Sequence, residues 1–167
     1  MRIKFTPYGL AALQQAYRDS PDVARRELLA AGNEAVALLE SDVKGRYPKH
    51  QGLTRASITG DAFSTPTGVL GVVGSSAPVA IFIELGTRPH TPPLEPLLLW
   101  VRDILGKTGD EGFAAARGIQ RKIRARGTKA NPLFAEAAAR HEAAIGRMFE
   151  DAAGRVAAQL GGQGGAA

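Results

Sequence analysis

The sequence predicts an α+β fold, in which a small antiparallel β-sheet packs against a long N-terminal helix and a helical segment follows toward the C-terminus. Three observations predict it. Residues 22–44 repeat small and apolar side chains at helical spacing, residues 55–74 hold two β-rich runs around a Pro/Gly turn, and residues 96–160 carry three more helical patterns. We expect a single domain over residues 1–160 and a flexible Gly-rich tail over residues 161–167.

The N-terminal leader precedes the long helix, with a strand expected over residues 2–5 and a helical turn after it. The sequence DSPD at residues 19–22 predicts the helix start, because it supplies a capping side chain, a first-turn proline and an acid at the positive end of the helix dipole. Gly45 and Pro48 end the helix. Small and apolar residues share the face that we expect to be buried: Ala24, Leu28, Ala31, Ala35 and Leu39.

The β region follows a polar connector at residues 47–54. Residues 55–64 and 69–74 predict a hairpin, because Pro and Gly in residues 65–68 favour a turn between them. One or two further strands would complete the sheet. Residues 79–85 fit either a strand or a short apolar helix, since periodicity does not separate the two in so short a run.

Three helices are expected after a proline-rich loop. The first spans residues 96–105 and ends at Gly106, and the second spans residues 111–126 and ends at Gly127. Asn-Pro at residues 131–132 starts the third. The buried stripe predicted for the third helix is Leu133, Ala137, Ala144, Met148, Ala152, Val156 and Leu160.

Composition excludes several classes of site. The chain has no cysteine, which rules out disulfides, thiol catalysis and cysteine-ligated metals, and its three histidines are widely separated. We therefore predict no metal and no cofactor. The triplet GKT at residues 106–108 follows a helix instead of opening one, so it predicts a helix stop and not a phosphate-binding loop. No apolar run is long enough to cross a membrane, and the N-terminus lacks the apolar core of a signal peptide, so we expect the protein to stay where it is made.

A basic segment stands out against the formal net charge of +5. Between residues 112 and 134 lie six basic side chains and no acidic one. If Ile119 faces the core, then Arg117, Arg121 and Arg124 share the opposite face, where they would follow a phosphate backbone, meet an acidic partner or face solvent. We expect Phe113 to face inward, so that base stacking is not indicated.

Residues 77–96 end an apolar run in an acid, a Gly-Thr turn and four prolines, and they are the candidate site. Glu84 and His90 would form a minimal acid–histidine pair, but no third group completes a catalytic set. The favoured interpretation is structural, with the Glu84 carboxylate accepting the N–H groups of the Gly-Thr turn or pairing with Arg88. The residues assigned to a partner-docking loop are Glu84, Gly86, Thr87, Arg88, Pro89, His90, Pro92 and Pro93.

The order of these features resembles the neck or tail-completion proteins of long-tailed bacteriophages. Residues 80–87, AIFIELGT, are similar to the family's A-x-x-(I/V)-E-x-G-T motif, and residues 48–58 resemble its P-x-x-T-G-x-L-x-x-S segment, with Gln-Gly at residues 51–52 in place of Thr-Gly. Residues 119–134 also resemble a variant of the family. The resemblance covers about residues 19–144.

This resemblance implies a structural virion protein without catalytic activity. Such proteins act at the head–tail junction as a ring of six subunits, between the head stopper or connector and the tail terminator or tail tube, and are assembled in the cytoplasm of the bacterial host. The proline loop would then dock to another subunit. DNA passing through the ring would give the Arg117, Arg121 and Arg124 face a contact. The alternative is a small basic DNA- or RNA-binding protein that uses the same face, and a hydrolase centred on Glu84 and His90 is the third hypothesis.

Overall fold

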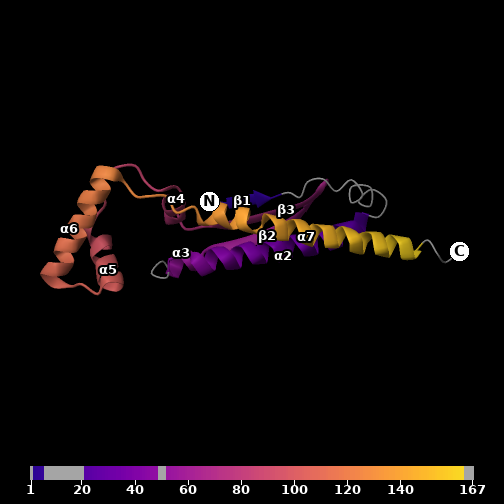
Figure 1. Ribbon diagram of the computed structural model, residues 1–167, viewed down its shortest axis with the longest axis horizontal. Helices are drawn as coiled ribbons and strands as arrows, with labels where there is room; N and C mark the ends of the chain where they lie inside the picture. Colours follow the sequence, from indigo (N-terminus) through magenta and orange to yellow (C-terminus); the bar gives the residue numbers. More distant parts are fainter. Residues whose placement is uncertain (1, 6–20, 49–51, 164–167) are drawn as a thin grey trace.

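The computed structural model describes residues 2–5, 21–48 and 52–163. The molecule is elongated, and a helical hairpin at residues 94–126, called the arm below, stands off one end of a larger body (Figure 1). The body contains the sheet and the two longest helices. The predicted α+β class is confirmed.

The sheet has three antiparallel strands in the order β1-β3-β2. β2 (Ile58–Thr65) and β3 (Gly68–Ser75) form the predicted hairpin, closed where Thr65 pairs with Gly68. β1 (Arg2–Phe5) pairs with the other edge of β3 and confirms the strand expected in the leader. The helical turn expected after it lies outside the described residues.

Two local predictions are corrected. The connector and the start of the first strand contain a short helix, α3 (Gly52–Ala56), so β2 begins only at the buried Ile58. Residues 79–85 are not a further strand but the helix α4 (Val79–Leu85). Ala80 and Glu84 are buried while Phe82 between them is 55% exposed, which fits a helical period, because in a strand these three alternate residues would share one face.

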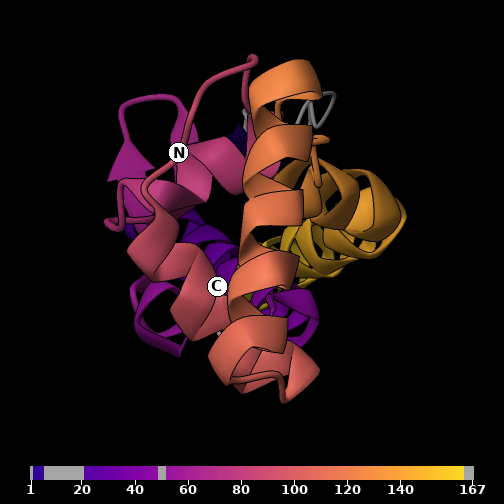
Figure 2. The ribbon, with the colours of Figure 1, turned by 90° about the vertical axis from the view of Figure 1, so that its left-hand side faces the viewer.

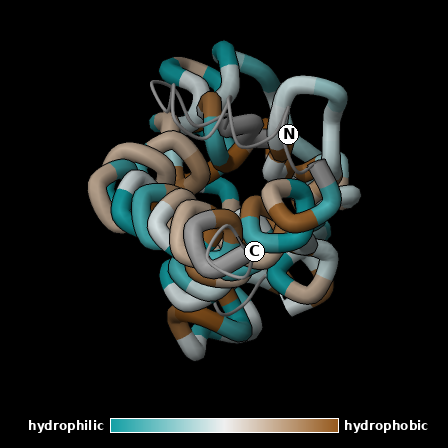
Figure 3. The backbone as a smooth tube through the Cα atoms, turned by 90° about the vertical axis from the view of Figure 1, so that its right-hand side faces the viewer, coloured by the Kyte–Doolittle hydropathy of each residue, from teal (hydrophilic) through white to brown (hydrophobic). Residues whose placement is uncertain are grey.

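The helices α2 (Pro21–Arg46) and α7 (Leu133–Gln163) cover one face of the sheet. They run antiparallel, as their ion pairs show: Arg46 near the end of α2 contacts Glu136 near the start of α7, while Glu27 contacts Arg155. Seen along the body from its far end, hydrophilic and hydrophobic residues alternate around the helical turns (Figure 3). The predicted buried face of α2 is confirmed at every position: Ala24, Leu28, Ala31, Ala35 and Leu39.

Small residues bring α2 close to the sheet. A Cβ atom added to Gly32 would lie 2.7 Å from the Cγ1 atom of Val69, and one added to Gly60 in β2 would collide with Val36 of α2. Valine side chains of the opposite element therefore occupy the space beside these glycines, and a larger residue at either position would not fit without a shift.

The buried stripe of α7 was predicted in part. Leu133, Ala137, Ala152 and Val156 are buried as expected, whereas Ala144, Met148 and Leu160 are half-buried. The stripe also includes residues that the prediction omitted: Phe134, Ile145 and Phe149. α7 continues through Gln163, into the segment predicted to be a flexible tail; residues 164–167 lie outside the described residues.

The arm consists of α5 (Leu94–Leu105) and α6 (Gly109–Arg126), which lie side by side in front of the body when viewed end-on (Figure 2). α5 ends where Gly106 takes a left-handed conformation, so the GKT triplet is a helix stop as predicted. Val101 of α5 and Gly112 and Ala116 of α6 are buried in the arm, whereas the body holds a much larger cluster of buried side chains. A single domain over residues 1–160 stays a prediction.

Candidate functional site

Glu84 is a buried structural residue at the junction of the body and the arm. Its side chain is 2% exposed, and its two carboxylate oxygens accept the backbone N–H groups of Phe134 and Ala135, each at 3.1 Å. These are orphan N–H groups of the first turn of α7, and the carboxylate satisfies them as a helix cap supplied by another element. The prediction of backbone N–H acceptance was correct in kind, but the expected partners, the Gly-Thr turn and Arg88, were wrong.

His90 does not pair with Glu84. Its ring Nδ1 lies 2.9 Å from the backbone oxygen of Arg88, and the side chain is exposed to solvent. Both oxygens of Glu84 are already engaged with backbone N–H groups, and the side chain is closed to water. The geometry therefore gives the acid–histidine hypothesis no support, because a catalytic acid must reach both its partner and a substrate.

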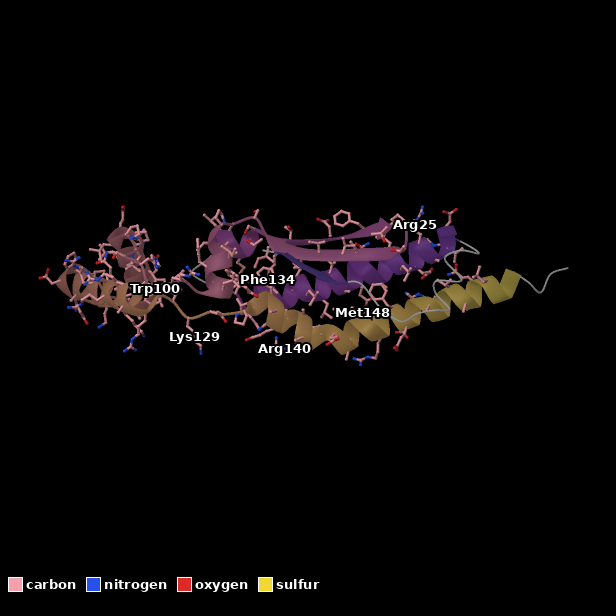
Figure 4. All side chains as sticks on the ribbon, turned by 90° about the horizontal axis from the view of Figure 1, so that it is seen from above. Arg25, Trp100, Lys129, Phe134, Arg140 and Met148 are labelled. Carbon is pink, nitrogen blue, oxygen red and sulfur yellow. The ribbon has the colours of Figure 1, made fainter. Side chains whose placement is uncertain are left out.

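Two chain segments form a stalk between the body and the arm, defined here as residues 86–93 and 127–132. Thr87 and Thr128 pair as an antiparallel bridge, with N–H···O distances of 3.1 and 3.2 Å in the two directions and 3.0 Å between their hydroxyl oxygens. Asn131 also donates its N–H to the carbonyl oxygen of Ile83 at 2.8 Å. Seen from above, Lys129 on the stalk lies between the arm with Trp100 and the start of α7 at Phe134 (Figure 4).

Glycine makes the pairing of the stalk possible. Gly86 and Gly127 both have positive φ angles, 70° and 71°. A Cβ atom on Gly86 would collide with the carbonyl oxygen of Thr128, and one on Gly127 with that of Thr87. The predicted Gly-Thr turn is therefore one half of a matched pair of Gly-Thr dipeptides.

The predicted docking loop is divided by the structure. Glu84 points into the body, Gly86 and Thr87 build the stalk, and the carbonyl oxygen of Pro92 accepts a hydrogen bond of 2.8 Å from Gln120 of α6. Pro93 immediately precedes α5 and is exposed. The other three residues of the predicted loop, Arg88, Pro89 and His90, line a groove of about 700 Å³ between α4 and the arm, called the apolar groove. The groove is also lined by residues that the sequence analysis did not assign to a site. Its lining is Val79, Phe82, Ile83, Thr87, Arg88, Pro89, His90, Leu97, Ile123, Thr128, Lys129 and Asn131.

The three arginines of the second predicted face lie on one side of α6, as their spacing predicts. Arg117, Arg121 and Arg124 are exposed and line one groove of about 360 Å³, called the basic groove, while Ile119 is half-buried. The prediction for Phe113 was wrong. Its side chain is 49% exposed, lines the same groove, and lies with its ring centroid 5.9 Å from the guanidinium carbon of Arg117. The helix buries Gly112 and Ala116 instead, which turns Phe113 outward.

Sequence reasoning missed two parts of the site. The pairing of residues 86–87 with residues 127–128 had a signal in the repeated Gly-Thr dipeptide, but nothing in the sequence placed the two copies together. The exposed apolar side of α4 was also missed, because an apolar run that is neither alternating nor long enough for a helical period gives no facing direction.

The described residues contain no group of three or more His, Asp or Glu side chains that could hold a metal ion, and no helix among them is long and apolar enough to cross a membrane. Beside the site, burial and then the charge of Glu84 raise the pKa of Tyr47.

A comparison with protein-family models, with curated proteins and with solved structures found no match to this chain.

Proposed function

We propose that this chain is a structural protein of the head–tail junction of a long-tailed bacteriophage. In this role it forms a closed ring of six subunits that joins the tail to the head connector, between the head stopper and the tail terminator or tail tube. It performs no catalysis. The proposal rests on the likeness of residues 80–87 to the family motif, and on how the chain uses that motif.

Exposed apolar side chains on α4 are the observation that carries the proposal. Four residues of this seven-residue helix are open to solvent although they are apolar: Val79 at 36%, Ile81 at 44%, Phe82 at 55% and Leu85 at 63%. A contiguous apolar patch on a protein surface marks a place where another chain packs. The apolar groove extends this patch to the stalk.

The residues of the motif make structural contacts within the chain. Glu84 caps α7, and Gly86 and Thr87 hold the second chain segment of the stalk, so the three motif residues together fix the arm to the body. A fixed arm offers its neighbour a pre-organised surface, which lowers the entropy that assembly costs. In a closed ring of heterologous contacts, the patch of each subunit meets a different face of the next one.

The test measures assembly and compares two sets of variants. We expect the purified chain to form a multimer by light scattering and a ring in electron micrographs. The double variant Phe82→Ser/Leu85→Ser should remain folded by circular dichroism but lose the multimer, because it makes the α4 patch polar. Leu53→Ser is the matched control, since Leu53 is 90% exposed on α3, outside the patch.

Two results would contradict the proposal. A wild-type chain that stays monomeric at high concentration and is absent from purified phage particles would remove it. Equal loss of assembly in Leu53→Ser would show that the effect does not come from the α4 patch.

A further inference from the structure

The positive charge of this protein is concentrated in the arm and the stalk. Between residues 88 and 129 the chain has nine Lys or Arg and four Asp or Glu residues, a formal surplus of five that equals the surplus of the whole chain. The remaining residues are balanced in charge. Attraction for a polyanion is therefore localised at one end of the elongated molecule.

Within this positively charged region, the basic groove is the concave surface, formed by α6 and the stalk. Phe113, Arg117, Arg121 and Arg124 follow one another along α6 at steps of four, four and three residues, which keeps them on one side of the helix. Thr91 of the stalk lies across from them, and the hydrogen bond from Gln120 to the carbonyl oxygen of Pro92 holds this part of the stalk against α6. The remaining lining residue is Ala114.

The groove's cations are not neutralised within the chain. Arg121 and Arg124 have no acidic partner among the described residues, and Arg117 donates to the neutral amide of Gln120 at 3.1 Å. The three residues spread over about 10 Å of helix axis at 1.5 Å per residue, so their guanidinium groups can each meet a different phosphate.

Residue chemistry favours nucleic acid over an acidic protein. All three cations of the groove are arginines, whose planar fork pairs with the oxygens of a phosphate or of a carboxylate, so the aromatic ring beside them decides between the two partners. Phe113 adds a half-exposed aromatic ring at the end of the arginine row, with the Arg117 guanidinium over one of its faces. A base can stack on this ring while the row follows the backbone, and an acidic peptide offers nothing of the kind.

We propose that the basic groove binds the sugar–phosphate backbone of nucleic acid without reading its sequence. Arg117, Arg121 and Arg124 contact successive phosphates, and Phe113 stacks with a base where the strand is unpaired. This binding does not depend on the head–tail assignment, so each of the two proposals can fail without the other.

The test uses the full chain and fluorescently labelled oligonucleotides of mixed sequence, one set duplex and one single-stranded, with binding followed by anisotropy. The groove variant Arg117→Gln/Arg121→Gln/Arg124→Gln should weaken binding about tenfold or more at low salt, because three phosphate contacts are lost. The matched control is Lys122→Gln/Arg126→Gln/Lys129→Gln, which removes the same charge from the same region outside the groove. It should weaken binding by less than about threefold, through long-range attraction alone.

Salt dependence and stacking give two further readouts. Three phosphate contacts predict a slope of about −2.7 for log K against log salt on duplex and about −2 on single strands, and the groove variant should flatten it. Phe113→Ala should weaken binding to single strands several-fold more than binding to duplex. Equal loss on both would remove the stacking role.

Three outcomes would overturn the inference. The first is no binding of either oligonucleotide at low salt. The second is equal loss in the groove variant and its control, which would mean diffuse charge attraction. The third is competition by poly-glutamate as effective as that by an oligonucleotide of equal charge, which would assign the groove to an acidic protein.

Discussion

Glu84 and Phe134 are fifty residues apart in the sequence, yet the Glu84 carboxylate accepts the backbone N–H of Phe134 at 3.1 Å inside the body. This contact joins α4 to the first turn of α7. The chain leaves the body after α4, passes through the stalk and the arm, and returns to α7 beside its point of departure. The Glu84 carboxylate therefore joins the two points at which the chain leaves the body and returns to it.

Glu84→Gln should lower the free energy of unfolding by about 1–2 kcal/mol, because the amide keeps one acceptor oxygen but loses the second and the charge at the helix start. Urea unfolding measures the change. Glu142→Gln, at an exposed position of the same helix α7, is the control and should stay within about 0.5 kcal/mol. An unchanged midpoint for Glu84→Gln would mean that the cap does not stabilise the fold.

Gly127→Ala should disturb the stalk, because the new Cβ atom collides with the Thr87 carbonyl oxygen. The backbone at φ 71° and ψ −160° also suits only glycine and adds about 1–3 kcal/mol of strain for any other residue. We expect faster hydrogen exchange of the N–H groups of Thr87 and Thr128, measured by NMR. Gly118→Ala tests the opposite case within α6, where nothing lies within 4 Å of the new Cβ atom. It should raise stability by about 0.5–1 kcal/mol. If both N–H groups exchange in Gly127→Ala as slowly as in the wild-type protein, the role given to Gly127 in the pairing is wrong.

Tyr47→Phe should leave stability at neutral pH unchanged or slightly higher. The Tyr47 hydroxyl is buried without a hydrogen-bond partner among the described residues. Burying an unsatisfied polar group costs about 1–3 kcal/mol, and the substitution removes this cost. A loss of more than about 2 kcal/mol would reveal a bond that the hydroxyl makes after all.

The same variant should change the alkaline limb of stability. Because burial, and then the Glu84 charge, raises the pKa of Tyr47 above its ordinary value of 10.0, the unfolded chain ionises first as the pH rises. The folded wild-type protein therefore loses stability above about pH 10. Tyr47→Phe should lose less, and chemical denaturation at a series of alkaline pH values measures the difference.

Glu27 should contribute stability that is lost in acid. Hydrogen bonds from Arg155 and then Gln159 lower its pKa from the ordinary value of 4.5. The contribution is thus present above pH 4.5 and disappears as the pH falls through the lowered pKa of the folded state. We expect Glu27→Gln to cost under about 1 kcal/mol at pH 7 and nothing below the lowered pKa. Glu34→Gln, at an exposed position of the same helix, is the control and should change the free energy of unfolding at pH 7 by less than about 0.5 kcal/mol.

The regular elements could be predicted because their signals are local. α2 repeats small and apolar residues every three or four positions, and every position predicted to be buried is buried. Gly106 and Gly127 mark helix ends through their own conformations. The Arg117, Arg121 and Arg124 face followed from helical spacing alone.

The tertiary structure decided what depends on partners far along the chain. Residues 79–85 were ambiguous because so short a run does not fix its own inward face. Glu84 takes its direction from the N–H groups of α7, which the local sequence does not contain. The outward turn of Phe113 depends on which face of α6 meets α5. The sequence by itself determined the element types and the basic helix face, since both are properties of spacing. Packing determined that Glu84 caps a distant helix and that two Gly-Thr dipeptides form one stalk, because those contacts exist only once the chain has returned to its starting point.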